Sequence, residues 1–189
     1  YDAIEVDSDV PEQKLFGGVR EVTSSYPIAE GDDPAGKAYL SYNVSAGSCS
    51  DVKLCTAMDI LNTVLLSSVG PLYQALVRSG ISPNIMSSFH DGIKQPFLSI
   101  VAQNTDPAKK EEFLKVIRDT LEKIADEGVP ERSLRAAINS AEFRYREADY
   151  GSYPKGLILG LMSMSSWLFN ENGAFDYLRG NELYAELKK

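Results

Sequence analysis

The stretch that decides the fold is residues 143–157, which reads FRYREADYGSYPKGL. A charged amphipathic helix runs into this stretch and is expected to end near Asp149, because residues 151–154 break a helix. Pro154 has a fixed φ angle and no N–H, so it suits the start of a second helix. That helix, residues 155–170, is apolar on nearly every side. A helix without a polar face is normally enclosed by protein, so we expect it to be the central helix of the domain or to face a partner domain.

The rest of the chain alternates between strand and helix patterns. Residues 37–45 alternate apolar and polar side chains, which is typical of a half-buried strand. Strands are expected at 37–45, 84–89 and 97–104, with one short strand within 16–27, and further helices at 51–70, 71–80, 107–128, 130–149 and 175–187. This order predicts an α+β domain in which helices pack on an antiparallel sheet.

Short motifs mark the ends of these elements. Ser50 or Asp51 can cap the first helix, and Asp106 can cap the helix that follows the last strand. The pair Asp91-Gly92 predicts a hairpin between the two later strands. Pro96 lacks an N–H, so we expect it to mark a sheet edge or a bulge.

Composition limits the classes of partner. The chain has 189 residues, of which 43% are hydrophobic, and this suits a single domain with a full core. Its net charge of −8 and the lack of a basic stripe argue against a nucleic-acid partner. No apolar run is expected to be long enough to cross a bilayer, so we expect no membrane partner. Residues 1–14 are acidic and resemble the end of a linker. Because the chain begins with Tyr1 and shows no signal peptide, we expect an intracellular piece of a longer protein.

Cys49, Cys55 and His90 are the cysteines and the single histidine of the chain. Two cysteines do not make a disulfide framework, so they are interpreted as reduced thiols. A catalytic zinc site usually takes three protein ligands, often two of them histidines, which this chain cannot supply. A metal held by all three residues is the alternative, but their spacing is not a recognised one. Cys55 also falls on the predicted core face of its helix, where a cysteine acts as a small hydrophobe.

His90-Asp91 could belong to a hydrolase triad. The carboxylate that orients a catalytic histidine reaches the ring across space, and a neighbour in sequence is poorly placed to do so. The chain also has no G-x-S-x-G motif. We interpret His90 as a surface residue, and an independent hydrolase that uses a serine and His90 is the weakest of three functional hypotheses.

Residues 31–38, GDDPAGKA, nearly spell a phosphate-binding P-loop. Ala38 lacks the hydroxyl that would hold Mg²⁺, and Asp32 and Asp33 would put negative charge where phosphates should lie. A strand, not a helix, follows. The segment is therefore interpreted as a turn. Asn43 begins a glycosylation sequon, but it lies in a predicted strand of a chain without a secretion signal.

Three carboxylates, Glu142, Glu147 and Asp149, lie on or near one helix. Glu142 and Glu147 are five residues apart and do not share a helical face tightly. Arg144 and Arg146 alternate with them and would neutralise their charge. We interpret the group as a solvated or interdomain salt-bridge surface.

Four segments together resemble the presequence-protease branch of the insulinase and pitrilysin zinc metallopeptidases. The resemblance runs over most of the chain, and its motifs are specific as a set although no single one would be. The segments are 25–37 (SYPIAEGDDPAGK), 71–81 (from Pro71-Leu72 to Gly80-Ile81), 91–96 (DGIKQP) and 142–157 (EFRYREADYGSYPKGL).

The resemblance implies a metallohydrolase-like fold, similar to mitochondrial processing peptidase. Members of the family contain four related α+β domains in two halves that close around a peptide, and their zinc motif, H-x-x-E-H, lies in the first domain. This chain resembles the second domain. No catalytic, cofactor-binding or metal residue of the family can be carried onto any position here, so zinc would belong to the parent protein and not to this fragment.

The function implied is that of a non-catalytic structural domain. It would complete the catalytic half and wall the chamber of a zinc-dependent metalloendopeptidase that degrades peptides, and alone it is predicted to be inactive. Its partners would be the other domains of the same polypeptide and, in the parent, a peptide substrate, in the bacterial cytoplasm or an organelle matrix. The alternative is a zinc-less scaffold domain of a related complex.

Overall fold

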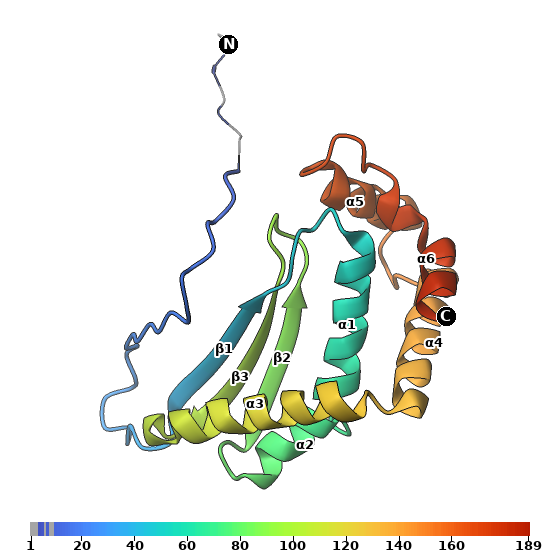
Figure 1. Cartoon of the computed structure of the whole chain (residues 1–189). Helices are drawn as coiled ribbons and strands as arrows, with labels where there is room; N and C mark the ends of the chain where they lie inside the picture. Colours follow the sequence, from blue (N-terminus) through green and yellow to red (C-terminus); the bar gives the residue numbers. More distant parts are fainter. Residues whose placement is uncertain (1–3, 6, 8–9) are drawn as a thin grey trace.

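The computed structural model describes residues 4, 5, 7 and 10–189 of the chain (Figure 1). A three-stranded antiparallel sheet lies at its centre, with β3 between β1 and β2. The predicted α+β class is confirmed. The strands are β1 (Ala38–Ser45), β2 (Asn84–His90) and β3 (Phe97–Thr105), and the α-helices are α1 (Val52–Leu66), α2 (Pro71–Arg78), α3 (Lys110–Glu127), α4 (Glu131–Glu147), α5 (Lys155–Trp167) and α6 (Gly180–Leu187).

The main core lies between one face of the sheet and helices α1, α2 and α3. The alternation along β1 that predicts a strand also decides this face, because Leu40 and Tyr42 turn toward the helices while Ser41 stays exposed. On β3, Ile100 and Ala102 are fully buried against the helices. The buried residues that form this core are Leu65, Leu66, Leu72, Leu76, Ile81, Ile85, Ile100, Ala102, Phe113 and Ile117.

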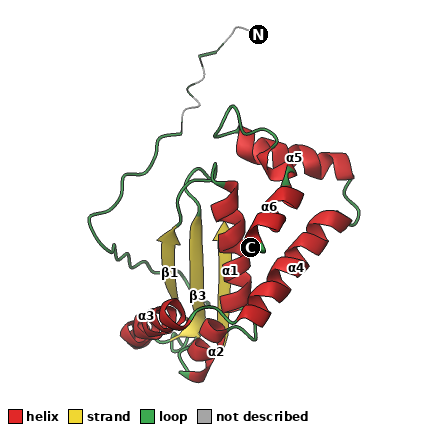
Figure 2. Cartoon of the chain, turned by 45° about the vertical axis from the view of Figure 1, so that its right-hand side comes forward, coloured by secondary structure: helices red, strands yellow, loops and turns green. Residues whose placement is uncertain are grey.

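A second, smaller core lies on the other side of α1. Ile60 and Val64 of α1 pack there against Ile138 and Ala141 of α4, with Tyr184 and Leu187 of α6 beside them. Figure 2 shows α4 and α6 on the side of α1 that faces away from the sheet. Helix α1 is therefore covered on two sides, which explains why it is apolar over most of its surface.

The predicted helix caps are confirmed. An Asp51 side-chain oxygen accepts a hydrogen bond from the Leu54 N–H at 2.9 Å, which satisfies a free donor at the start of α1. Asp106 accepts from the Ala108 N–H at 2.8 Å in the same way, at a short 3₁₀ turn (Pro107–Lys109) that leads into α3.

The predicted strand within residues 16–27 is wrong. The structure gives this segment no strand, and the side chains of Val19 and Val22 are almost fully exposed. Its apolar residues suit a strand, but no described strand pairs with it, so its backbone hydrogen bonds have no ladder to join. Whether a segment pairs with a neighbouring strand depends on the rest of the fold, and the sequence of the segment alone does not determine it.

The prediction for Pro96 is also wrong. Pro96 is buried and directly precedes β3, the central strand, and so marks neither an edge nor a bulge. Its carbonyl accepts a hydrogen bond from the Ala46 N–H at 2.8 Å. Because pairing in the sheet begins at Phe97, the missing N–H of Pro96 interrupts no ladder bond.

One stretch, Val52–Arg78, is long and apolar enough to pass for a membrane span by length and composition, so the expectation that no such run exists is wrong. The structure divides the stretch into α1 and α2, and residues of both lie in the main core. Core helices of ordinary globular proteins pass the same test. The absence of a membrane partner stays a prediction.

Of the predicted linker at 1–14, residues 1–3, 6, 8 and 9 lie outside the described residues. Residues 10–14 are exposed and have no regular secondary structure.

Candidate interdomain surface

The corner between α4 and α5 forms as the sequence predicts. Helix α4 ends at Glu147, and Ala148 takes a left-handed conformation with φ 47°. An Asp149 side-chain oxygen then accepts from the Gly151 N–H at 3.0 Å, which holds a tight turn. Pro154 follows and leads directly into α5.

Helix α5 is not the central helix of the domain, and that part of the prediction is wrong. Ser166 is the only residue of α5 that the structure buries fully, and the exposed apolar side chains of the helix and its C-terminal end are 50% to 74% accessible. They form one stripe at a spacing of three and four residues: Leu157, Leu161, Met164, Trp167 and Leu168. The other prediction for this helix, that it faces a partner domain, is the one the exposure favours.

Two glycines in α5 are also consistent with a partner domain on this helix. A Cβ atom added at Gly156 or Gly160 would meet no atom within 4 Å. Neither glycine has a positive φ angle, so neither the backbone nor the packing of the described chain requires a glycine there. Each glycine costs a helix roughly 1 kcal/mol relative to alanine.

The segment after α5 is tied firmly to α4, which holds α5 in place. The Tyr145 hydroxyl donates to the Leu178 carbonyl at 2.6 Å and accepts from the Gly180 N–H at 3.1 Å. The Tyr145 ring lies so close that a Cβ on Gly180 would come within 2.5 Å of it. On α5 itself, the buried Ser166 hydroxyl donates to the Gly173 carbonyl at 2.5 Å. These hydrogen bonds hold α5, and with it the exposed apolar stripe, in a fixed position relative to α4.

The face of the sheet that turns away from the helices carries no Asp, Glu, Lys or Arg side chain. Strand register places four rows of three residues on this face, which we call the open sheet face. In a chain that is 24% charged, twelve residues would carry about three charges on average. The twelve are Tyr39, Ser41, Asn43, Ser45, Asn84, Met86, Ser88, His90, Phe97, Ser99, Val101 and Gln103.

Cys49, Cys55 and His90 do not form a metal site in the structure. Both cysteines are buried and free, and burial raises the pKa of each thiol, which makes them poor nucleophiles and metal ligands. His90 is exposed at the end of β2, where its ring stacks on Phe97 at 4.5 Å. In the described part of the chain, no three His, Cys, Asp or Glu side chains are placed to hold an ion.

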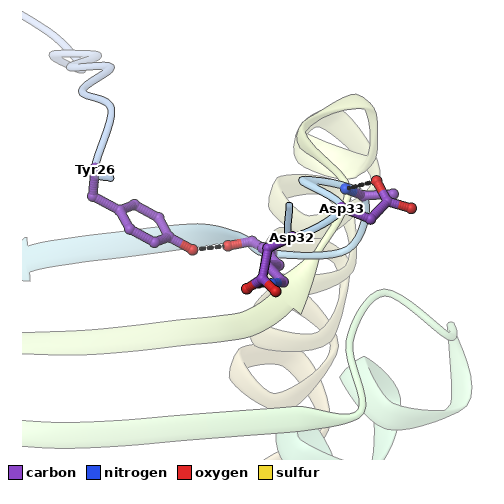
Figure 3. A network of polar contacts seen from close by, with 5 residues as sticks. Tyr26, Asp32 and Asp33 are labelled. Atoms are coloured by element: carbon purple, nitrogen blue, oxygen red, sulfur yellow. Dashed lines mark hydrogen bonds and ion pairs between the residues drawn. The ribbon is translucent and has the colours of Figure 1, made fainter. Parts of the chain in front are cut away.

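The P-loop-like segment is a turn, as predicted. Figure 3 shows Tyr26, whose hydroxyl donates to the Lys37 carbonyl, beside Asp32 and Asp33. Asp32 pairs with the Lys37 ammonium group, and an Asp33 oxygen accepts from the Ala35 N–H at 2.9 Å. The turn leads into β1, so no helix N-terminus is available there for a phosphate.

The carboxylates near the end of α4 divide into two kinds. Glu142 is mostly buried and pairs with Arg146 at 2.7 Å and with Lys188 at the end of α6. The hydrogen bond from Lys188 lowers the pKa of Glu142 most, and Arg146 lowers it further. Glu147 and Asp149 are exposed. Glu142 does form salt bridges, as predicted, but they lie within the domain and are largely shielded, so the interpretation as a solvated or interdomain surface is wrong for this residue.

Residues 3–141 match the family model of the peptidase M16 inactive domain. The chain belongs to this family. The match ends within α4, so α5 and α6 lie beyond it.

Curated relatives of this inactive domain are much longer than the chain. It is 39% identical over 167 residues to protein HypA of Clostridium perfringens, an alignment that covers 88% of the chain and 17% of HypA. It is 30% identical over 184 residues to presequence protease 1, chloroplastic/mitochondrial, of Arabidopsis thaliana, covering 96% of the chain and 17% of that protein. The chain thus spans about a sixth of each relative, and its resemblance to presequence proteases is confirmed.

Two solved structures share the fold. A protein assigned as a zinc protease from Bordetella pertussis Tohama I superposes with a TM-score of 0.63 at 16% identity, over 82% of both chains. The inactive peptidase domain of a protein assigned as a zinc protease from Bordetella parapertussis gives a TM-score of 0.59 at 16% identity, over 82% of this chain and 84% of that one.

Sequence reasoning did not find two features of this inactive domain. The first is the open sheet face, although the alternation of β1 already separates Tyr39, Ser41 and Asn43 from the core residues. Combining the polar halves of all three strands would have revealed a face without charge. The second is the tie between Tyr145 and Gly180, for which the sequence contains no local signal because the two residues are 35 positions apart.

Proposed function

We propose that this chain is the non-catalytic domain of a zinc-dependent metalloendopeptidase that degrades peptides in a closed chamber. The observation that carries the proposal is the match to the peptidase M16 inactive domain in a chain with one histidine. The whole of 1–189 would act as one domain, with 1–14 as linker, and no residue of it would be catalytic or bind zinc. The parent protein would hold the zinc and work in a bacterial cytoplasm or an organelle matrix.

The open sheet face would form part of the chamber wall. Its side chains are mainly hydroxyls and amides, which can hydrogen-bond an extended peptide without selecting for the charge of the peptide. A chamber that processes many sequences gains from such a wall, because a charged wall would repel or trap peptides of one sign. The lack of charge on this face supports the role.

The stripe on α5 would contact another domain of the same polypeptide. Its anchors lie along one side of the helix, as in helices that pack against an apolar groove. An exposed apolar group of this size is typical of an interaction site. The relatives are about six times as long as this chain, so a neighbouring domain is the partner that the family supplies.

One experiment separates the catalytic from the structural role. The 189-residue chain and its longer parent polypeptide are each assayed for bound zinc and for cleavage of unstructured peptides, with and without a chelator. We expect the parent to bind zinc and cleave peptides in a chelator-sensitive way, and the chain alone to do neither. Stoichiometric zinc in the chain would contradict the proposal. A parent without an H-x-x-E-H motif would instead favour the scaffold alternative.

A second experiment tests the chamber wall in the parent. Asn43→Asp places one negative charge on the open sheet face with almost no change in shape. We expect KM to rise for acidic peptides and to fall for basic ones. Asn139→Asp, on an exposed position of α4, is the matched control and should change neither value. Equal effects of the two variants would remove the open sheet face from the chamber.

A further inference from the structure

The turn between β2 and β3 holds the main chain of a distant segment. The Gln95 side-chain oxygen accepts a hydrogen bond from the Gln13 N–H at 2.6 Å, and its amide nitrogen donates to the Gln13 carbonyl at 3.0 Å. One side chain therefore satisfies both backbone groups of one residue, as a strand residue does in a hydrogen-bonded antiparallel pair. Beside it, the Lys94 ammonium group donates to the Val10 carbonyl at 2.6 Å.

These three bonds all end on backbone atoms. The polar part of the contact therefore depends on the main chain of the segment and not on its side chains. Val10, Phe16 and Ile93, each about half buried, border a shallow hollow of about 360 Å³ between the segment and the turn. We call residues 10–16 the incoming segment.

Beyond residue 16 the chain is tied again only at the other end of the sheet. Glu21 pairs with Lys110 at 2.7 Å, and the Tyr26 ring packs on Tyr39 at 5.7 Å. Between these ties, Val19 and Val22 are almost fully exposed. Figure 1 shows this stretch in blue, running beside the strands from the β2–β3 end of the sheet to the start of β1.

We propose that Lys94 and Gln95 form a main-chain docking site that fixes where the incoming segment reaches the sheet. The chain at Val10 and Gln13 is then held at one end of the open sheet face. The segment is part of the same chain, so its effective concentration at the site is high, and it outcompetes a dissolved peptide of similar affinity. The proposal does not rest on the peptidase role.

Limited proteolysis of the 189-residue chain tests it. Trypsin cleaves after Lys14, within the incoming segment, and cleavage of a docked segment follows the fraction of time that the segment is released. Mass spectrometry measures the rate at this bond in the wild type and in Gln95→Ala. Gln74→Ala is the control, because it removes a glutamine whose amide bonds the Ser68 carbonyl instead.

We expect Gln95→Ala to raise cleavage after Lys14 about fivefold. Its thermal midpoint should stay within about 1 °C of the wild type, and Gln74→Ala should leave cleavage unchanged. Equal rates in wild type and Gln95→Ala would overturn the proposal. A faster rate that comes with a lower midpoint would also overturn it, since Gln95 would then support the fold as a whole. So would faster cleavage on adding a lysine-free extended peptide, which would assign the site to peptides in general.

Discussion

Strand β3 and helix α5 are both rich in apolar residues, yet they lie in opposite environments. Ile100 and Ala102 of β3 are fully buried, whereas Leu161 and Trp167 of α5 are at least half exposed. Side chains of a strand point alternately to opposite faces, so burial alternates along β3 even though Phe97 and Val101 place apolar residues on its open face as well. The helix is apolar on nearly every side, so its sequence predicts that other protein covers it but does not indicate which segment or domain does so. The comparison shows that a high apolar content does not by itself predict burial within this chain, because burial depends on which other segments reach the element.

The largest expected effect is in the main core. Phe113 is 1% exposed and packs among the buried residues of the sheet and of α2 and α3. Phe113→Ala should lower the free energy of unfolding by about 3–5 kcal/mol, from lost burial and the cavity left behind. Urea denaturation of the chain measures this. A loss under about 1 kcal/mol would mean that this core is loosely packed.

Alanine substitutions at two glycines are expected to change the stability of the chain in opposite directions. At Gly180 a Cβ would collide with the Tyr145 ring, which two hydrogen bonds hold in place, so Gly180→Ala should cost about 1–3 kcal/mol. At Gly160 a Cβ meets nothing, so Gly160→Ala should stabilise the chain by about 0.5–1 kcal/mol through helix propensity. Thermal unfolding compares them. A loss of stability on Gly160→Ala would contradict this expectation, because it would mean that another part of the chain packs against Gly160.

Trp167 tests the difference between β3 and α5 directly. Its side chain is 58% exposed, although the apolar sequence of α5 suggests that it is buried. Trp167→Ala should cost the isolated chain less than about 1 kcal/mol, as surface substitutions do. Trp167 is also the single tryptophan, so its fluorescence reports on α5 alone. Its emission should be that of a solvated indole and should be readily quenched by acrylamide. A cost of 3 kcal/mol or more, with blue-shifted emission, would return α5 to the core.

The smallest effect concerns the tie between α4 and α6. The pKa of Glu142 lies below its ordinary value of 4.5 in the folded chain, mainly through the hydrogen bond from Lys188. A lowered pKa adds stability above the ordinary value and loses it as pH falls through the folded value. Glu142→Gln should therefore destabilise the chain slightly at pH 7, and the difference should shrink toward pH 3. Glu122→Gln, at an exposed position in the middle of α3, is the control; a pH-independent difference at Glu142 would rule out the charge as the cause.

Much of the fold follows from local signals in the sequence. The alternation of β1, the caps Asp51 and Asp106 and the break at Pro154 are each encoded within a few residues, and each is found where expected. The expected strand at 16–27 failed because strand pairing depends on a distant partner. The candidate surface was predicted in part: the apolar α5 was visible in the sequence, but its exposure depends on which other segments reach it.

The account depends most on α5 being uncovered in this chain and covered in its parent. Hydrogen–deuterium exchange of the backbone amides of residues 155–168, compared between the 189-residue chain and the longer polypeptide, measures this. We predict rapid exchange in the chain, with protection rising at least tenfold in the parent. Equal protection in the two proteins would contradict the account, because α5 would then have no partner in the rest of the polypeptide.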